Sequence, residues 1–237
     1  MEVSVLPKIF AISDLHLGFS CDKPMNIFGN RWENHEERLY ENWQQTVGED
    51  DIVLVPGDIS WETYLSNTFD DFDFINKLNG TKIITKGNHD YWWETLSKLN
   101  KFLDENNFKT IKFLHNTNVV FKNVCICGTK GYPETEGIPT DDEGKRLYLR
   151  EISRLENAVS EASKTGAEKI VVMLHYPPGT DSEFARILKE AKVDYCIYGH
   201  LHGGTFGAVT KGNVGGVEYR LVSADYLKFS PVEIMEI

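Results

Sequence analysis

This sequence of 237 residues has no long apolar run. A membrane-spanning helix needs about 20 consecutive, mostly apolar residues, so we expect no membrane span. Residues 1–7 also lack the basic segment and the long apolar segment that together make a secretory signal. We therefore expect a cytoplasmic protein.

Cysteine is scarce, and its spacing argues against a thiolate metal site. The four cysteines include no pair in the Cys-x-x-Cys spacing that structural zinc sites commonly use. Cys125, Cys127 and Cys196 lie within apolar, strand-like runs. We expect these three and Cys21 to be buried, reduced thiols, as is usual in a cytosolic protein.

Basic residues are outnumbered. The chain has 25 Lys and Arg against 36 Asp and Glu, which gives a formal net charge of −11. Nucleic-acid binding needs a basic surface for the phosphates, so we expect no long nucleic acid as partner. A small substrate whose charge metal ions can offset fits better. The length suits a single α/β domain over residues 1–237.

One pattern recurs five times: a short apolar run, rich in β-branched residues, that ends in Asp, Asn or His. Each run reads as a buried strand. In open α/β sheets, ligands bind at the carboxyl ends of the strands, so we expect the polar tips to meet. The runs and their tips are 8–13 with Asp14 and His16, 51–56 with Asp58, 82–86 with Asn88, His89 and Asp90, 169–174 with His175, and 193–198 with His200 and His202.

The side chains at these tips are typical of a metal site. Imidazoles, carboxylates and one amide, with no thiolate, suit divalent Mn, Fe, Zn or Co. Asp14 and His16 are two residues apart, so on an extended tip both can point the same way. Seven candidates are too many for one ion and enough for two, with Asp58 as the candidate bridge. The seven are Asp14, His16, Asp58, Asn88, His175, His200 and His202.

The order Asp-x-His, Gly-Asp, Gly-Asn-His-Asp, His and Gly-His-x-His, between Asp14 and His202, resembles the calcineurin-like metallophosphoesterase family. The resemblance implies an α/β fold: a sandwich of two β-sheets flanked by helices, in four layers, with a two-metal centre at the strand ends. It implies His89 as general acid. It also implies two ligand sets: Asp14, His16, Asp58 and His202 for one ion, and Asp58, Asn88, His175 and His200 for the other.

The expected function is a metal-dependent phosphoesterase that hydrolyses a phosphomonoester or phosphodiester of a small molecule. Two ions would activate a water as hydroxide for attack on phosphorus, and His89 would protonate the leaving oxygen. One alternative is a catalytically silent scaffold on the same fold, although no ligand is missing here. Another is a metal-dependent hydrolase of a different bond, such as an amide or a lactone.

Asp90 and the phosphate-binding cations are open questions at this point. Asp90 could orient His89, as a third catalytic residue with His89 and Asp58, or it could cap the following helix. Phosphoprotein phosphatases of this family carry an Asp-Arg pair where this chain has Trp61-Glu62, so that activity is in doubt. The cations that could grip a phosphate instead are Arg31, Lys86, Lys130, Lys145, Arg146 and Arg150.

Helical periodicity separates the strands. A stripe that includes Trp32 and Trp43 predicts a core-facing helix, and a longer helix is expected from about Lys145 to Thr165. Residues 131–144 combine glycine, proline and acidic residues, and they form either a lid, within an insertion over 131–150, or a plain solvated connection. His35 and His115 belong to no motif, and we expect them to be structural.

Overall fold

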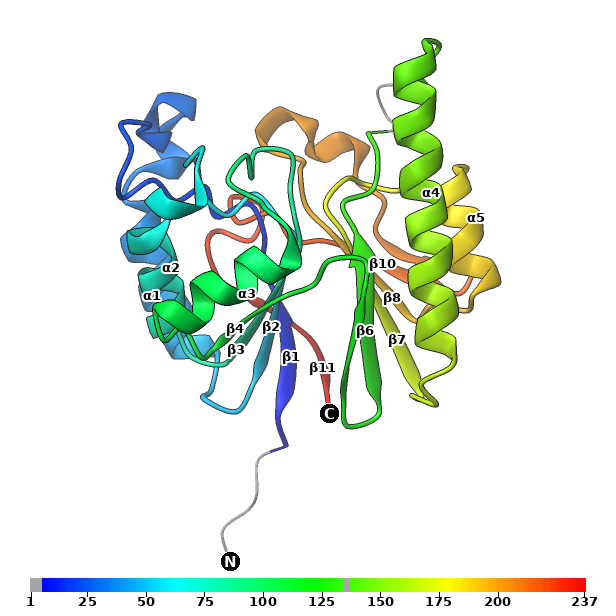
Figure 1. Ribbon diagram of the computed structural model, residues 1–237, viewed down its shortest axis with the longest axis horizontal. Coiled ribbons are helices and arrows are strands. Elements are labelled where there is room, and N and C mark those ends of the chain that lie inside the picture. The colour runs from blue at the N-terminus through cyan, green and yellow to red at the C-terminus, as the bar shows by residue number, and fades with distance from the viewer. Residues whose placement is uncertain (1–5, 134–136) are drawn as a thin grey trace, which may run out of the picture.

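Two β-sheets packed face to face form the centre of the molecule, and helices cover both outer faces (Figure 1). The computed structural model describes residues 6–133 and 137–237. The layers follow the order helix, sheet, sheet, helix. The predicted α/β fold, a two-sheet sandwich flanked by helices, is therefore confirmed.

The first sheet has the strand order β11-β1-β2-β3-β4. Its strands are β1 (Lys8–Ala11), β2 (Ile52–Val55), β3 (Thr81–Ile84), β4 (Ile111–Phe113) and β11 (Val232–Glu236). β1 to β4 are parallel, while β11 runs antiparallel to β1 at the edge. The parallel strands therefore end together, as the alternation of strands and helices predicted.

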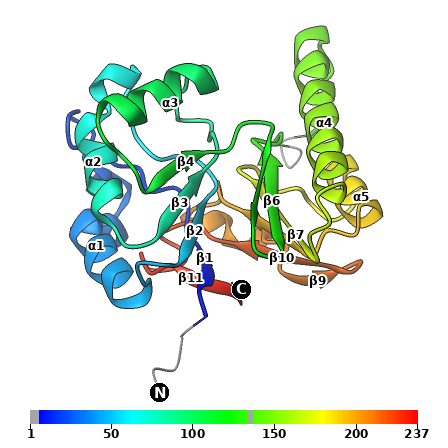
Figure 2. The same cartoon turned by 60° about the horizontal axis from the view of Figure 1, so that its bottom comes forward.

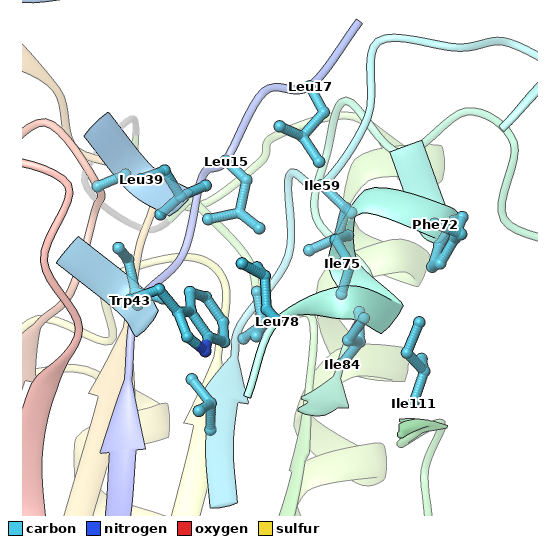
Figure 3. Close-up of a cluster of buried hydrophobic side chains, with 14 of the residues drawn as sticks. Leu15, Leu17, Leu39, Trp43, Ile59, Phe72, Ile75, Leu78, Ile84 and Ile111 are labelled. Carbon is cyan, nitrogen blue, oxygen red and sulfur yellow. The ribbon is translucent and has the colours of Figure 1, made fainter. Parts of the chain in front are cut away.

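Three helices cover the outer face of this sheet: α1 (His35–Thr46), α2 (Phe69–Lys77) and α3 (Leu96–Glu105). Their apolar faces and the sheet enclose one buried cluster, which Figure 3 shows around Trp43 and Phe72. The prediction that Trp43 faces the core is confirmed, since it is fully buried.

The second sheet has the strand order β5-β6-β7-β8-β10-β9. β6, β7, β8 and β10 are parallel, and antiparallel strands lie at both edges. The strands are β5 (Asn118–Phe121), β6 (Val124–Thr129), β7 (Lys169–Leu174), β8 (Tyr195–Tyr198), β9 (Gly212–Val214) and β10 (Val217–Leu221).

Alternate residues of the strands face opposite layers. In β1, Ile9 and Ala11 join the cluster between the two sheets, whereas Phe10 packs in the cluster under α1 to α3. The same division holds in β7, where Met173 lies between the sheets and Leu174 faces α4 and α5. Because both faces of each sheet are buried, the strand ends are held in fixed positions.

The outer face of the second sheet is covered by α4 (Asp142–Ser163) and α5 (Glu183–Glu190), as Figure 2 shows from a second direction. α4 begins before the expected Lys145, because the Asp141 side chain accepts a hydrogen bond of 2.8 Å from the Gly144 amide. The later part of the candidate lid, residues 131–150, is therefore helix. Residues 134–136 of that segment lie outside the described residues, and a lid stays a prediction.

The structure bears on the expected lack of a membrane span and on the state of the cysteines. Within residues 6–133 and 137–237, no helix is long and apolar enough to span a bilayer. All four cysteines are free thiols, and Cys125, Cys127 and Cys196 are buried. The prediction is wrong for Cys21, which is only half-buried because it lies in the loop after β1.

A buried lysine in β3 gives the fold a pH dependence. The Lys82 side chain is fully buried, and its ammonium donates to the carbonyls of Leu78 and Gly80 at 2.5 and 2.9 Å. Burial lowers the pKa of Lys82 from 10.5 to about 7, so the unfolded state binds more protons between these values. The free energy of unfolding should therefore rise through this window, by at most about 1.4 kcal/mol per pH unit.

Urea unfolding of the native protein and of Lys82→Met, between about pH 7 and about pH 10.5, measures this contribution. The difference between the two proteins isolates Lys82 from the other groups that titrate in the same range. Parallel pH profiles would show that the ammonium keeps its ordinary pKa in the folded state.

Candidate metal centre

The loops after five parallel strands bring the candidate ligands to one end of the sandwich. Those after β1, β2 and β3 belong to the first sheet, and those after β7 and β8 to the second. Two groups of ligand atoms lie within 4.8 Å of one another: Asp14, His16 and His202, and Asp14, Asp58 and His175. Both sheets therefore contribute to one site.

The remaining candidates join the same cluster. Asn88 Oδ1 lies 2.7 Å from His175 Nε2 and 2.9 Å from His200 Nδ1. Asp58 Oδ2 lies 3.9 Å from His16 Nε2 and 3.5 Å from His175 Nε2. The structure therefore brings all seven candidates together, with the Asp58 carboxylate between histidines of the two expected ligand sets.

Four of the candidate ligands have a left-handed backbone conformation. Asp14, His16, Asp58 and His200 have positive φ angles of 57°, 48°, 54° and 72°. This left-handed conformation is unfavourable for residues other than glycine, and such strain clusters at functional sites. The expectation of extended tips at Asp14 and His16 is thus wrong, because the chain turns at each of these residues.

Hydrogen bonds on the far side of two imidazoles fix which nitrogen faces the site. His175 Nδ1 lies 2.9 Å from the carbonyl of Pro56, and His202 Nδ1 lies 2.8 Å from Asp225 Oδ1. Each Nδ1 therefore donates its proton outward, which leaves Nε2 as the ligand atom. Metal-binding histidines are held in this way, so the donor set fits divalent cations.

Asp225 was not identified from the sequence. It follows β10, but Glu218 and Arg220 alternate with apolar residues in that strand. The strand therefore lacks the short apolar run that indicated the other tips.

Burial sets the charges of the site. It lowers the pKa of His175 to about 3, so this imidazole is neutral. At His202, burial is outweighed by the carboxylates of Asp14 and Asp225, which raise the pKa to about 10. Burial, together with Asp90 and Asp14, raises the pKa of Asp58 well above 3.8. Buried carboxylates this close together call for positive charge.

Glycines leave room for the carboxylates. A Cβ atom at Gly199 would overlap Asp14 Oδ2 and Ser13 Oγ, and one at Gly87 would overlap Asp58 Oδ1. We expect Gly199→Ala to displace the Asp14 carboxylate and to weaken metal binding roughly 10- to 100-fold, the cost of disturbing a ligand's support.

The check is metal content after dialysis against buffered metal, with Gly207→Ala as the matched control. Gly207 is exposed, and a Cβ there meets no atom within 4 Å. Circular dichroism confirms that both variants fold. Equal metal content in the two variants would contradict the assigned position of Asp14.

Asp90 does not cap the following helix, and its hydrogen bonds go mainly to backbone amides. The N-cap of α3 is Thr95, so the helix-cap expectation is wrong. The buried Asp90 carboxylate instead accepts hydrogen bonds from four backbone amides and from Trp92 Nε1, and none of these donors belongs to His89. The amides are those of Gly87, Asp58, Ile59 and Ser60, at 2.7 to 3.4 Å. Asp90 therefore joins the loop after β2 to the loop after β3.

An apolar cavity of about 440 Å³ opens beside the cluster. His89 lines it, next to Trp61, whose ring centre is 4.7 Å from that of His89. Trp61 also stacks on His16 at 4.8 Å. Burial lowers the pKa of His89, although the Asp14 carboxylate opposes this effect. The other residues around the cavity are His16, Met25, Phe28, Arg31, Trp32, His202, Gly203, Gly204 and Asp225.

Trp32 contacts both the hydrophobic core and the apolar cavity. It is buried in the core as predicted, yet it also lines the cavity, with its ring centre 5.8 Å from that of His16. It lies in a 3₁₀ turn, Asn30–Trp32, before α1. The sequence could not show this, because Trp32 was assigned to a helix that starts later.

The candidate phosphate-binding cations separate into three places. Arg31 lies at the apolar cavity, with Nη1 3.4 Å from Asp225 Oδ2. Lys86, Lys130 and Arg150 meet at a second, smaller cavity. Lys145 and Arg146 are exposed on α4.

Fold and site together define a metallohydrolase of the two-sheet type, with a cluster of histidine, aspartate and asparagine at the strand ends. The model of the calcineurin-like phosphoesterase family matches residues 7–204. The chain therefore belongs to this family, as its motifs indicated. No curated protein matches the chain.

Solved structures share the fold at low sequence identity. The phosphopantetheinyl hydrolase PptH from Mycobacterium tuberculosis is 13% identical with a TM-score of 0.57, over 98% of this chain and 97% of that one. AQ665, a protein of unknown function from Aquifex aeolicus, is 16% identical with a TM-score of 0.53, over 96% and 95%. The sulfate thiohydrolase SoxB from Thermus thermophilus is 14% identical with a TM-score of 0.50, over 95% and 53%.

Proposed function

We propose that this protein is a two-metal phosphoesterase that hydrolyses a phosphomonoester or phosphodiester of a small molecule. The observation that carries the proposal is the complete cluster of seven candidate ligands, with His89 on the wall of the adjoining cavity. A silent scaffold would not need four strained backbone positions at the cluster.

The proposed ligand sets share Asp58. One ion would be held by Asp14, His16, Asp58 and His202, and the other by Asp58, Asn88, His175 and His200. When bound, the two cations neutralise charge on the phosphoryl oxygens and lower the pKa of the attacking water. They would be Mn, Fe, Zn or Co, which suit these nitrogen and oxygen donors.

The chain's own residues take the other roles. His89 faces the cavity beside the cluster, so its protonated ring can give a proton to the leaving oxygen. The Asp58 carboxylate accepts a 2.8 Å hydrogen bond from the His89 amide, which fixes the backbone of the acid relative to the metals. Asp90 is a positioning residue, because its carboxylate accepts hydrogen bonds from the loop after β2 and from the loop after β3 and so holds the two loops together.

The cavity favours a leaving group with an apolar or aromatic part. Met25, Phe28, Trp32 and Trp61 supply large apolar side chains to its wall. Arg31, which is half exposed and close to Asp225, is the cation at this wall and the candidate to contact phosphate there.

A hydrolase of another bond is the second candidate, and the likeness to SoxB, a thiohydrolase, shows that the fold is not limited to phosphoesterases. The test is metal analysis of protein purified without chelator, followed by a panel of phosphomonoesters, phosphodiesters, amides and thioesters. We expect about two ions per chain and turnover of a phosphate ester. Full metal content with turnover of an amide or thioester alone would select the second candidate, and metal-free inert protein would select the scaffold.

A further inference from the structure

A second cavity lies between strand ends of both sheets. It has a volume of about 210 Å³ and is lined by residues at the ends of β3, β4 and β6 and in the middle of α4. None of its lining residues lines the apolar cavity. Its walls include Thr85 and Lys86 after β3, Lys130 after β6, and Trp93.

This cavity gathers positive charge in an acidic protein. Lys86, Lys130, Arg150 and Arg154 line it, against the single carboxylate of Glu151, whereas the whole chain carries −11. Glu151 is already engaged: it accepts a hydrogen bond from Thr129 Oγ1 and an ion pair of 2.6 Å from Arg154 Nη1. Burial lowers the pKa of both Lys86 and Lys130, and it outweighs the charge of Glu151, which raises the pKa of both lysines.

Within residues 6–133 and 137–237, neither lysine forms an ion pair: no carboxylate there lies within 4.0 Å of the ammonium of Lys86 or Lys130. The Lys130 ammonium lies over the ring of Tyr176, 5.5 Å from its centre. Half-buried cations without a counter-ion are costly unless an anion joins them.

Two residues that line the cavity, Thr85 and Trp93, each carry a buried donor without a partner among the described residues. In the described part of the chain, nothing lies within hydrogen-bond distance of Thr85 Oγ1 or Trp93 Nε1, although these side chains are 1% and 9% exposed. Such groups are rare in folded proteins and call for an explanation. An indole N–H can only donate, so the missing partner of Trp93 is an acceptor.

The cavity adjoins the metal centre without belonging to it. Lys86 stands two residues before the candidate ligand Asn88, and the Lys130 carbonyl accepts a 3.0 Å hydrogen bond from the His175 amide. Tyr176, beneath the Lys130 ammonium, packs its ring 4.5 Å from that of His200. The ring of Tyr176 therefore lies between the Lys130 ammonium and the candidate ligand His200.

We propose that this cavity binds a phosphoryl group through Lys86, Lys130, Thr85 and Trp93. A phosphoryl group offers three strong acceptor oxygens, enough for both unpartnered donors and both lysines, whereas a carboxylate offers two. Arg150 and Arg154 at the rim add the forked donors that suit phosphate. The volume is below the ~300–1,000 Å³ of pockets for whole small molecules, so the site takes one group rather than an entire substrate.

The phosphoryl group could come from a second phosphate on the substrate or from free phosphate. The first source rests on the proposed function.

The first experiment measures binding and does not depend on activity. Calorimetry with inorganic phosphate on the metal-loaded protein, with a crystal soaked in phosphate to place it, compares native protein with Thr85→Val and Lys130→Met. Lys101→Met, an exposed lysine on α3, is the control.

We expect phosphate in the cavity of native protein and of Lys101→Met, and affinity there reduced roughly 10- to 100-fold in Lys130→Met. Thr85→Val removes only a hydroxyl that has no partner, so this variant should fold at least as well as native protein yet bind phosphate more weakly. An empty cavity in native protein, or unchanged phosphate affinity in both variants, overturns the proposal. Metal content is measured in every variant. If it is unchanged, weaker phosphate binding cannot be due to loss of metal.

Kinetics then distinguish the sources. An ester with one phosphate is compared with the same ester carrying a second phosphoryl group. A KM raised only for the second substrate in Lys130→Met identifies the cavity as a substrate site. Equal KM values, with weaker phosphate binding, identify it as a site for free phosphate.

Discussion

Asp58→Asn is expected to deplete both metal sites at once. The Asp58 carboxylate lies between His16 and His175, at 3.9 and 3.5 Å, so in the proposed ligand sets its negative charge would serve both ions. A carboxamide keeps the shape and removes that charge. Loss of a supporting contact alone costs about 10- to 100-fold in metal affinity or activity, and loss of a shared ligand should exceed this.

Metal analysis and turnover of a phosphate ester measure the effect, with Asp73→Asn as the matched control. Asp73 is a surface residue of α2 that pairs with Lys77. The control should keep about two ions per chain. Full occupancy and full activity in Asp58→Asn would remove the bridging assignment.

His89→Ala is expected to slow hydrolysis according to the leaving group. A nitrophenolate leaves without help, whereas an alkoxide needs a proton. General acid catalysis contributes ~10²–10⁴-fold, so the loss should approach that range for alkyl esters and be much smaller for nitrophenyl esters. Metal content should be unchanged, because the candidate ligands all remain.

The measurement is a series of esters with both proteins, plotted against the pKa of the leaving group. Tyr64→Ala, an exposed ring that lines neither the apolar cavity nor the second cavity, is the control. A uniform loss across the series would show that His89 positions the substrate, and loss of metal would make it a ligand.

The contribution of His89 to hydrolysis should decrease as the pH rises. Burial lowers the pKa of His89 below 6.5, and bound cations act in the same direction. The acid is the protonated form, so hydrolysis of alkyl esters should fall as the pH rises through this lowered pKa. Nitrophenyl esters should show a weaker fall, and His89→Ala should abolish the difference between the two classes.

The fold and the cluster could be predicted from the sequence because both depend on local patterns. A buried parallel strand is a short apolar run, and its carboxyl end is marked by the next polar residue. Five such runs placed seven side chains correctly at one end of two sheets. Asp225 also follows a parallel strand, β10, but Glu218 and Arg220 interrupt the apolar run there, so the rule does not mark it.

The role of Asp90 and the second cavity could not be predicted, because both depend on contacts between segments far apart in the sequence. Asp90 was interpreted through its neighbours, but its partners Asp58 and Ile59 lie in another loop, about one strand and one helix away. The second cavity joins Lys86, Lys130 and Arg154 from three elements. No spacing in the sequence indicates that these cations meet, or that Thr85 Oγ1 and Trp93 Nε1 beside them have no hydrogen-bond partner among the described residues.

The pairing of β1 with β11 has a consequence for synthesis on the ribosome. Lys8 pairs with Glu236 and Ala11 with Val232, so one edge of β1 gains its partner only after nearly the whole described chain has been made. At ~5–20 residues per second, that edge waits on the order of 10 to 45 seconds. An unpaired strand edge invites pairing with other chains. We expect nascent chains that stall before β11 to aggregate or to recruit chaperones, although every candidate metal ligand has already been translated by then.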